Sequence, residues 1–541
     1  MSQLSGANTQ HRVLRITSVL GLLALLVASC APTAPAAGSP ATTAQPATGP
    51  AATAAAVTPQ PQVALKKVTI STVAPITTLD YTAPQYNGVP VRQGALLGSG
   101  GYLYSFQPNG SLEPDLAADF PKVADNKLSM TVSLRSGLKY SDGTAVDAED
   151  VVTAFGRTKK GPHASRLVGF DSAQASDERT IVFKLNAPVD IQTQAGVLSY
   201  WIPVHPRARV SDSKYFEKPV SASRYTITDW TPGGSAMVLQ ANPSYWRGKP
   251  AIEQIVLQSA TDPTSRVLQV TTGQADVAFD IPASAVKQLP AEAKSLVVPI
   301  GGVFWIGIRT DVPGALGDVR VRQAICLAVD RGAINTRAFL GNAEPVAAPL
   351  SRYQPGWKYE PILPGNGARD VATAKKLLTE AGYAQGFSFP LQTWGARPGW
   401  TDAAVVISEN LKDLGITAKV EPIEDAVAIA NLTNSKFDAQ FSGGGGDTIT
   451  TLTTLYSPDG FWAKATRFNQ PEVSGLVDQL RRTTDTAAAQ KLQVDLLKLA
   501  WDKSATICPL NERAIVAASR VQTSALQFVA AEQLFYVGTL K

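Results

Sequence analysis

The sequence predicts an α/β protein in which strands and helices follow one another along the chain and the sheets are mixed. Three observations predict this class. Short segments alternate apolar and polar residues, as half-buried strands do. Longer segments repeat apolar residues at helical spacing behind an acidic N-cap. The chain also shows no internal repeat and no single unit of the dinucleotide-binding type.

The N-terminus has the features of a cleaved leader. Arg12 and Arg15 precede an apolar run at 16–27, which is too short to span a bilayer comfortably. Small residues and Cys30 follow directly, in the pattern of a lipobox. We therefore predict a signal peptide at 1–29 and lipidation of the Cys30 thiol, which would anchor the chain to the outer face of the cytoplasmic membrane. The alternative is an ordinary cleavage site with an incidental cysteine.

The segment after the cysteine is predicted to be a disordered tether. From Ala31 to Gln62 the chain is almost entirely Ala, Pro, Thr, Gly, Ser and Gln, without charge, so it cannot offset the entropy of ordering. Removal of 1–29 takes away two arginines and no acid, and the net charge falls from +5 to +3. This charge and the absence of a basic tract argue against nucleic-acid binding.

The remaining chain is long enough for two or three lobes built from mixed elements. Strands are predicted at 67–73, 128–134, 180–185 and 437–442. Helices are predicted behind the N-caps Asp147 and Asp318, and at 372–381, 403–414 and 484–501.

Catalytic and metal-binding patterns are missing. Outside the leader the histidines are His163 and His205, too few for a histidine-based triad or a zinc site, and His205 is expected at the surface beside a turn. Cys326 and Cys508 remain after lipidation. A bridge between them is possible outside the cytoplasm, but we favour buried free thiols because Cys326 lies in an apolar helical stretch. We expect no catalytic residue, no metal, no cofactor and no enzyme activity.

Five segments, in order along the chain, resemble the extracellular solute-binding proteins of family 5, the oligopeptide, dipeptide and nickel type of ABC transporters. The first contains LEPDLAADF and VSLRSGLKYSDGTAVDAEDVVTAF, the second NPSYWRGKP and GQADV, the third DVRVRQAICLAVDRGAI, the fourth AKKLLTEAGY and the fifth FDAQFSGGGGD. They lie at 112–155, 225–277, 318–334, 374–383 and 437–447.

The resemblance implies a periplasmic-binding-protein-like clamshell of two lobes plus an inserted domain, closing on its ligand. The two crossing segments would be 304–308 and 507–510. The resemblance also implies a monomer that hands a small molecule or peptide to an ABC permease with cytoplasmic ATPases. The implied parts are the signal peptide (1–29), lipidated cysteine and tether (30–65), lobe one (66–105, 199–303 and 509–541), inserted domain (106–198) and lobe two (304–508).

The ligand site is expected around Asp447, which matches the family position whose carboxylate pairs with a peptide amine. It follows Gly443–Gly446, and Gly444 stands where peptide-binding members carry a tryptophan, so an aromatic wall is missing. The structural alternative is that Asp447 is a turn residue after a glycine run.

Three tryptophans, Trp394, Trp400 and Trp462, are expected in loops of lobe two, where they could stack on sugar rings. An oligosaccharide is therefore one alternative ligand, and nickel is another that few histidines argue against. A sensor or chaperone lipoprotein on the same fold is the alternative of a different class.

Overall fold

The computed structural model describes residues 66–537, with gaps at 84–88, 108–110, 165–166, 168, 187–196, 200, 355, 484, 522–525 and 530–533. The predicted signal peptide, Cys30 and the whole tether (30–65) lie outside the described residues. Within the described part of the chain, no helix is both long enough and apolar enough to cross a membrane.

One ten-stranded mixed sheet runs through the described chain, in the order β14-β13-β15-β12-β16-β11-β1-β10-β9-β8. β1 pairs in parallel with β10 and β11, and β13 with β14 and β15, whereas β12 pairs antiparallel with β15 and β16. The strands are β14 (Thr417–Ile423), β13 (Ser388–Trp394), β15 (Ala439–Gly445), β12 (Lys294–Ile308), β16 (Ile507–Ser519), β11 (Val277–Ala278), β1 (Lys67–Thr72), β10 (Gln254–Ser259), β9 (Ala236–Ala241) and β8 (Tyr225–Trp230).

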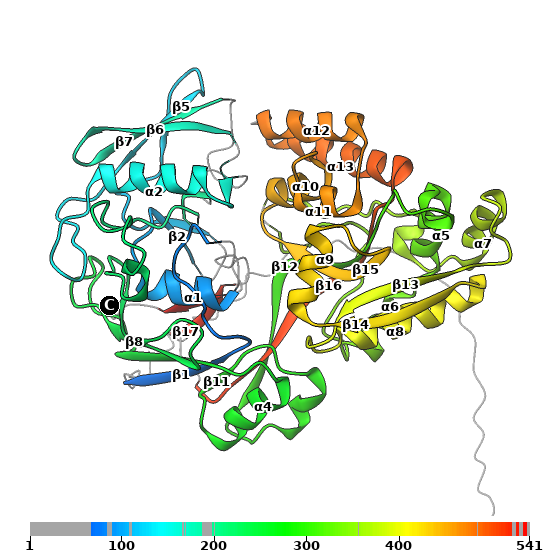
Figure 1. The fold of residues 1–541 in the computed structure, drawn as a ribbon, viewed down its shortest axis with the longest axis horizontal. Coiled ribbons are helices and arrows are strands. Elements are labelled where there is room, and N and C mark those ends of the chain that lie inside the picture. The colour runs from blue at the N-terminus through cyan, green and yellow to red at the C-terminus, as the bar shows by residue number, and fades with distance from the viewer. Residues whose placement is uncertain are drawn as a thin grey trace, which may run out of the picture. The chain divides into compact units, whose positions relative to one another are not determined.

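The two longest strands, β12 and β16, run side by side through the middle of this sheet (Figure 1). Their pairing extends from Lys294↔Ser519 to Gly307↔Ile507, with register shifts between Pro299 and Gly302 and between Phe304 and Trp305. The predicted crossing segments, 304–308 and 507–510, form one end of this pair.

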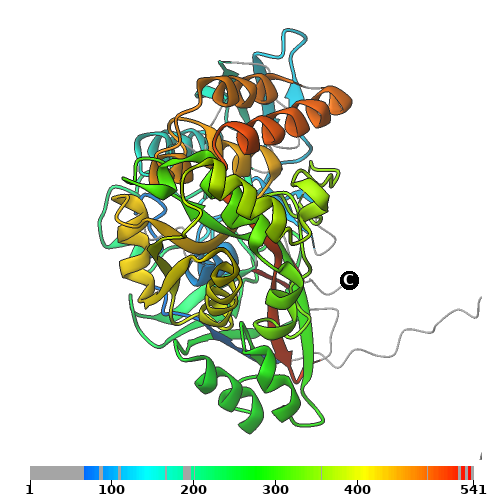
Figure 2. The ribbon, with the colours of Figure 1, turned by 90° about the vertical axis from the view of Figure 1, so that its right-hand side faces the viewer.

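Helices cover the part of the sheet that follows β12 in sequence. In both views α12 and α13 lie side by side (Figures 1 and 2). The helices after β12 are α5 (Val319–Ala328), α6 (Arg331–Arg337), α7 (Val371–Glu380), α8 (Trp400–Leu411), α9 (Asp425–Thr433), α10 (Thr448–Tyr456), α11 (Phe461–Thr466), α12 (Pro471–Arg482) and α13 (Thr486–Lys503).

A separate four-stranded sheet, β4-β5-β7-β6, carries α2 (Ala148–Lys160). Its strands are β4 (Lys122–Val123), β5 (Ser129–Ser133), β7 (Thr180–Leu185) and β6 (Phe170–Asp177). The other elements are α1 (Val89–Gly98), β2 (Tyr104–Phe106), β3 (Leu112–Pro114), α4 (Pro263–Thr272), β17 (Leu526–Val529) and β18 (Leu534–Val537).

The buried apolar side chains form four clusters. The largest draws on residues from Val303 to Leu510, and another on residues 103–222 around the four-stranded sheet. A third combines residues 68–300 with Ile515 and Ala517 of β16, and a small fourth also includes β16 residues. Thus β16 contributes side chains to cores on both sides of the sheet's middle, as a strand joining two lobes does. The lobe boundaries themselves stay a prediction.

Most predicted elements are present, and the capped helices are the most accurate. The Asp147 carboxylate accepts a hydrogen bond from the Asp150 amide at 3.0 Å, and that of Asp318 one from Arg320 at 2.8 Å. The predicted strand at 437–442 begins and ends later, as β15, because its glycines continue to pair with β12.

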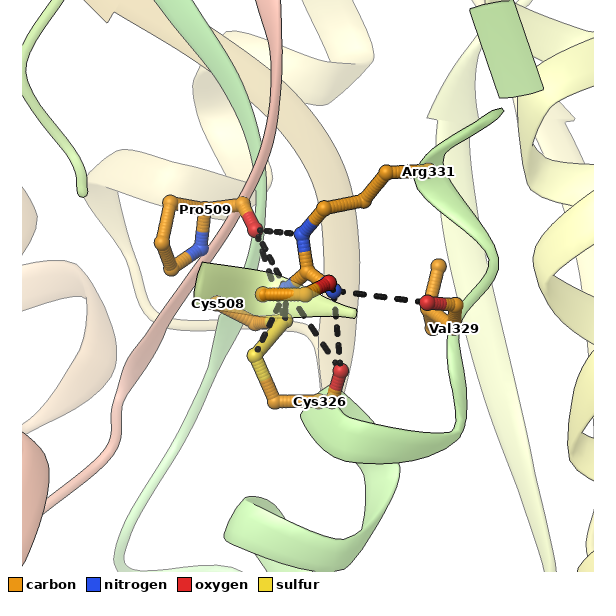
Figure 3. Close-up of a disulfide and its surroundings, with 6 residues drawn as sticks. Cys326, Val329, Arg331, Cys508 and Pro509 are labelled. Atoms are coloured by element: carbon orange, nitrogen blue, oxygen red, sulfur yellow. Dashed lines mark hydrogen bonds between the residues drawn. A yellow bond between two sulfur atoms is a disulfide. The ribbon is translucent and has the colours of Figure 1, made fainter. Parts of the chain in front are cut away.

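The expectation of free thiols is wrong, because Cys326 and Cys508 form a disulfide with Cα atoms 5.4 Å apart (Figure 3). Cys326 lies on α5 and Cys508 on β16, and α5 packs against that strand. Their separation of 182 residues hid this adjacency in the sequence. The expectation of an exposed His205 is also wrong, because its side chain is buried. Its Nδ1 lies 3.0 Å from the Tyr215 hydroxyl, and burial lowers its pKa to about 3.

Candidate ligand-binding site

The glycine run of β15 is explained by close packing at each of its first three positions. A Cβ on Gly443 would lie 2.8 Å from Arg513 Cδ and 2.9 Å from the Val303 carbonyl oxygen. A Cβ on Gly444 would lie 2.5 Å from the indole of Trp305, and one on Gly445 would lie 2.5 Å from the backbone of Gly301. Side chains from β12 and β16 therefore occupy the space that the missing tryptophan was expected to leave open.

Asp447 is the N-cap of α10. Its Oδ1 accepts a hydrogen bond from the Thr450 amide at 2.9 Å, which satisfies one of the free donors at the start of the helix. Gly446 precedes it with φ +134°, a conformation that side chains rarely adopt. The structural role weighed in the sequence is thus a helix cap rather than a plain turn, and one carboxylate oxygen is already engaged.

The three tryptophans do not lie in loops, as was expected. Trp394 ends β13, Trp400 begins α8 and Trp462 lies within α11. Their exposed fractions are 8%, 6% and 7%. The flanking glycines suggested loops, but Gly399 and Gly460 are instead the N-cap positions of two helices.

Trp394 and Trp400 form an aromatic pair with ring centroids 5.9 Å apart. The Arg397 guanidinium lies over both rings, 4.6 Å and 5.1 Å from their centroids. Its Nη2 also pairs with Asp425 Oδ2 at 3.0 Å. The charge of Arg397 is therefore paired with the Asp425 carboxylate, and its guanidinium plane lies over two indole rings.

The predicted site residues fall on two faces of the β12–β15 pair. Phe304 and Gly443 are register partners and share one face, to which Trp400 belongs, 5.2 Å from Phe304. Trp462 contacts Trp305, with centroids 5.4 Å apart, on the other face. Gly444 also lies against Trp305, so the predicted set is divided rather than gathered into one pocket.

Arg513 of β16 is the residue that the sequence reasoning missed. Its guanidinium lies 5.7 Å from the ring centroids of both Phe304 and Trp400. Its Nε is buried and donates to no group in the described part of the chain. Burial, reinforced by the charge of Arg397, lowers the pKa of Arg513 to about 10. A signal was available, because the polar run Asn511-Glu512-Arg513 interrupts a mostly apolar strand.

Asp280 is close enough to interact electrostatically with Arg513 and Arg397, and it lies in the part of the chain on the β1 side of the sheet. It stands between Phe279 and Ile281, which belong to two clusters on the β1 side of the sheet. Its φ of +55° is rare for a residue with a side chain and marks a constrained position. Burial raises the pKa of Asp280, against the opposing attraction of Arg266, Arg397 and Arg513. The structure gives no ion pair between the Asp280 carboxylate and any described cation.

Three buried polar atoms around Arg397 have no hydrogen-bonding partner among the described residues. They are the donors Arg513 Nε and Trp394 Nε1 and the acceptor Asp425 Oδ1. Other described buried atoms also lack a partner, but these three lie together beside one side chain, which makes this group the candidate place for a polar molecule. The same described region holds no group of His, Cys, Asp and Glu side chains suited to a metal ion.

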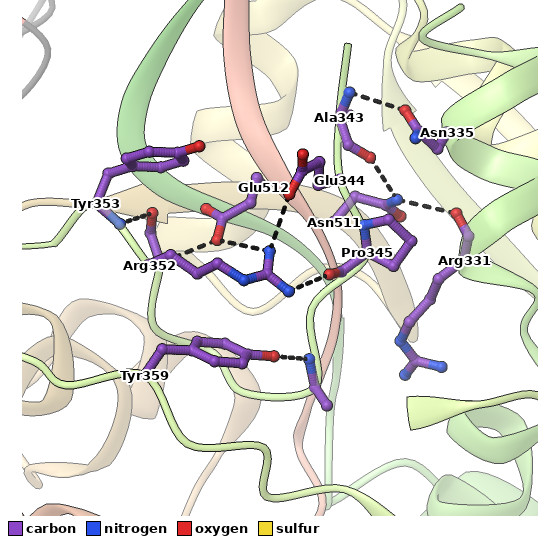
Figure 4. A network of polar contacts seen from close by, with 12 residues as sticks. Arg331, Asn335, Ala343, Glu344, Pro345, Arg352, Tyr353, Tyr359, Asn511 and Glu512 are labelled. Carbon is purple, nitrogen blue, oxygen red and sulfur yellow. Dashed lines mark hydrogen bonds and ion pairs between the residues drawn. The ribbon is translucent and has the colours of Figure 1, made fainter. Parts of the chain in front are cut away.

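The strand that carries Arg513 is fixed by a polar network next to it (Figure 4). Glu512 Oε1 accepts hydrogen bonds from the Arg352 amide at 2.9 Å and from its Nη1 at 3.4 Å. Asn511 Nδ2 donates to the carbonyl oxygens of Arg331 and Ala343, at 2.9 and 2.8 Å. Burial raises the pKa of Glu512. These bonds hold the backbone on which Arg513 is mounted.

Comparison with known proteins gives a consistent result. Protein XP55 of Streptomyces lividans is 27% identical over 71% of this chain and 74% of its own length. The glutathione-binding protein GsiB of Pectobacterium atrosepticum is 25% identical over 87% of this chain and 93% of its own. The structure of the oligopeptide-binding protein AppA of Bacillus subtilis with a nonapeptide matches with TM-score 0.74 and 19% identity, covering 87% of this chain and 99% of that one.

The AppA likeness confirms the predicted fold class, a mixed α/β protein of the periplasmic-binding-protein type. The model of the bacterial extracellular solute-binding proteins, family 5, matches residues 111–463, more than half of the chain. Its members are binding proteins. The chain belongs to family 5 of the bacterial extracellular solute-binding proteins.

Proposed function

We propose that this protein is the lipid-anchored substrate-binding component of an ABC importer and that it binds a short peptide between its two lobes. One observation carries the location of the site. Unpartnered buried polar atoms of Arg513, Trp394 and Asp425 lie around Arg397 and the rings of Trp394 and Trp400. A peptide supplies both hydrogen-bonding groups and apolar side chains for such a place.

The peptide class is supported by the names of similar proteins, which are described as binding glutathione and a nonapeptide. Asp447 remains the proposed partner of the peptide amine. Its Oδ1 caps α10, and its Oδ2 accepts from no described group, so that oxygen is available to an ammonium. A buried ammonium without a counter-charge would cost several kcal/mol, which makes such a partner necessary.

An oligosaccharide is the weaker candidate. Sugar stacking needs open indole faces, but Trp394 and Trp400 are more than nine-tenths buried and carry Arg397 over their rings. Trp462 packs edge-on against Trp305. Nickel as a bare ion would need a cluster of ligating side chains, and the described residues contain none.

The ligand is best identified from the protein itself. The full chain, purified with its anchor in mild detergent, should release a peptide on denaturation that mass spectrometry can sequence. Titration of that peptide back into the emptied protein should restore binding and raise the midpoint of thermal unfolding. Release of a neutral sugar or of a metal chelate alone would contradict the peptide class.

Anchoring is tested separately. The Cys30→Ser variant should lose acylation and leave the membrane fraction, or remain uncleaved, because the thiol is the proposed acceptor of the lipid. A variant that is processed and membrane-bound as before would contradict the lipobox.

A further inference from the structure

We propose that Arg513 is the receptor for a carboxylate of the ligand, so that the imported solute is a short peptide held by its free C-terminus. This inference rests on the proposed function and deepens it. It names the chemical group that the site recognises and the side chain that recognises it.

The first step concerns hydrogen bonding. A guanidinium has five N–H donors, and those of Arg513 donate to no group in the described part of the chain. Its Nε is buried, whereas its terminal nitrogens are not among the fully buried, unpartnered atoms. The free donors therefore form a fork with one inner and two outer nitrogens, which is the arrangement that binds a carboxylate through two parallel bonds.

The second step concerns rigidity. The stem of Arg513 lies against the backbone at Gly302 and Gly443, whose missing Cβ atoms would be 3.4 and 2.8 Å from its Cδ. Its guanidinium lies over Phe304 and Trp400, 5.7 Å from each ring centroid. A side chain held by glycine backbone and two rings loses little further freedom when it binds an anion. The glycine run thus acts as a cradle for an arginine.

The third step concerns charge. Arg397 is already neutralised by Asp425 at 3.0 Å, so it does not need an anion from the ligand. Arg513 has no carboxylate within ion-pair distance among the described residues. Asp280 is near enough to attract it electrostatically, but the two make no ion pair. A partly buried cation without a partner is unfavourable, and a ligand carboxylate would remove that penalty.

The fourth step concerns ligand length. Asp447, the proposed partner of the amine, is four residues beyond Gly443, against which Arg513 packs. Four residues of chain span at most about 14 Å, whereas a dipeptide spans about 7 Å and a tripeptide about 10 Å. A peptide of up to about four residues therefore spans the largest backbone separation that Gly443 and Asp447 can have, and a longer one would need to bend or project beyond the pair.

The test uses the full chain with its anchor in detergent, emptied by partial unfolding and refolding. The probes are three synthetic pools of dipeptides and tripeptides, identical except for their ends: free, N-acetylated and C-amidated. Calorimetry should show binding of the free pool, with amidation weakening affinity by about 30-fold or more, as loss of a desolvated charge pair does.

Arg513→Gln should weaken binding of the free pool to the same extent and should leave binding of the amidated pool unchanged. Arg513→Lys should restore part of the affinity, because it keeps the charge and loses the fork. Arg520→Gln is the matched control and should bind like the wild type. Arg520 lies just beyond the end of β16 and already pairs with Glu292. Thermal unfolding of each variant checks that it is folded.

The outcomes separate the two levels of the proposal. Tight binding of all three pools, unaffected by Arg513→Gln, would overturn the carboxylate receptor and leave the peptide function standing. No binding of any pool would overturn both. Asp280→Asn tests whether Arg513 takes its counter-charge from Asp280 or from the ligand. Unchanged or tighter binding of the free pool supports the receptor, whereas a loss equal to that of Arg513→Gln would show that Asp280 is the true partner of Arg513.

Discussion

Two arginines beside β16 share an environment and differ in their hydrogen bonds. Arg331 of α6 is buried and Arg513 of β16 is partly buried, and burial lowers the pKa of both to about 10. Arg331 donates from Nε and Nη2 to the Pro509 carbonyl oxygen, at 3.0 and 2.8 Å, and from Nη1 to that of Gly367 at 2.8 Å. Arg513 donates to nothing described. The burial of charge is therefore common to both arginines, and the unused donors of Arg513 are what distinguish it from Arg331.

The region around Arg331 is closed by a covalent bond as well. Its Nη2 lies 3.4 Å from Cys326 Sγ and 3.8 Å from Cys508 Sγ (Figure 3). Disulfide, guanidinium and carbonyl groups together tie α5 and α6 to the first residues of β16. Beyond Glu512 the strand leaves this network and reaches Arg513. Asn511 Oδ1 and Glu512 Oε2 also lack described partners, but the other groups of this network hold the strand, whereas Arg513 makes no hydrogen bond to a described group.

The largest loss of stability expected around Arg331 follows removal of the disulfide. The double variant Cys326→Ala, Cys508→Ala should lose stability, because the bridge closes a loop with a sequence separation of 182 residues and the chain-entropy model gives about 5 kcal/mol for a loop of that size. Denaturant unfolding of the variant and the oxidised wild type measures the difference. Equal midpoints would show that the packing of α5 on β16 suffices without the bond.

The second prediction compares the two arginines directly. Arg331→Met should destabilise the protein by about 3 kcal/mol, because it leaves several buried carbonyl oxygens without donors. Arg513→Met should leave the free energy of unfolding unchanged or raise it, since it removes a buried charge that has no partner.

Chemical denaturation of the two variants, each with the wild-type disulfide intact, checks this contrast. Similar losses of stability in both would mean that Arg513 also serves the fold, and the distinction between the two regions would fail.

The third prediction concerns the cradle beneath Arg513. Gly443→Ala should cost about 1–3 kcal/mol, because the new Cβ would lie 2.9 Å from the Val303 carbonyl oxygen as well as against Arg513. It should also weaken binding of free peptides. Gly475→Ala on α12, where an added Cβ meets nothing within 4 Å, is the matched control and should stabilise the helix slightly. A neutral Gly443→Ala would show that the arginine stem can move aside.

The sequence predicted the fold better than the site, for physical reasons that these residues illustrate. Helix starts at Asp147 and Asp318 depend on local chemistry, in which a carboxylate meets an amide two or three residues ahead, so they could be read directly. The disulfide and the position of Arg513 depend on which distant strands lie side by side. No local pattern carries that information, and the separation of Cys326 from Cys508 illustrates it.

The glycine run Gly443–Gly446 also shows that contacts between distant strands could not be predicted from the sequence. Its composition suggested open space near a ligand, yet the space beside Gly443 and Gly444 is occupied by Arg513 of β16 and Trp305 of β12. The tryptophans were likewise expected in loops with open faces, but Trp394 and Trp400 pack against Arg397. Sequence reasoning was wrong about the loop setting of these tryptophans, whereas the role of Asp447 and Gly444 in ligand binding stays a prediction.

The smallest effect is expected at Asp447, where the structural and functional roles can be separated by two substitutions. Asp447→Ala should cost about 1 kcal/mol in stability, because it removes the acceptor for the Thr450 amide at 2.9 Å. Asp447→Asn should be close to neutral, since Asn caps helices about as well as Asp. Both should weaken the binding of peptides with a free amine, because neither retains the carboxylate.

The comparison between the two variants decides what Asp447 does. If Asn restores both stability and affinity, the side chain acts through the helix cap, and the amine must find its counter-charge elsewhere. Asp280 is then the candidate, because it makes no ion pair with a described cation and lies close enough to Arg513 to interact with it electrostatically. If Asn restores stability alone, the charge itself is recognised. N-acetylation of the probe then supplies the independent check, because it should weaken binding to the wild type and have little further effect on Asp447→Asn. In that case a carboxylate capping α10 and a guanidinium lying on a glycine cradle would together recognise the opposite charges at the ends of a short peptide.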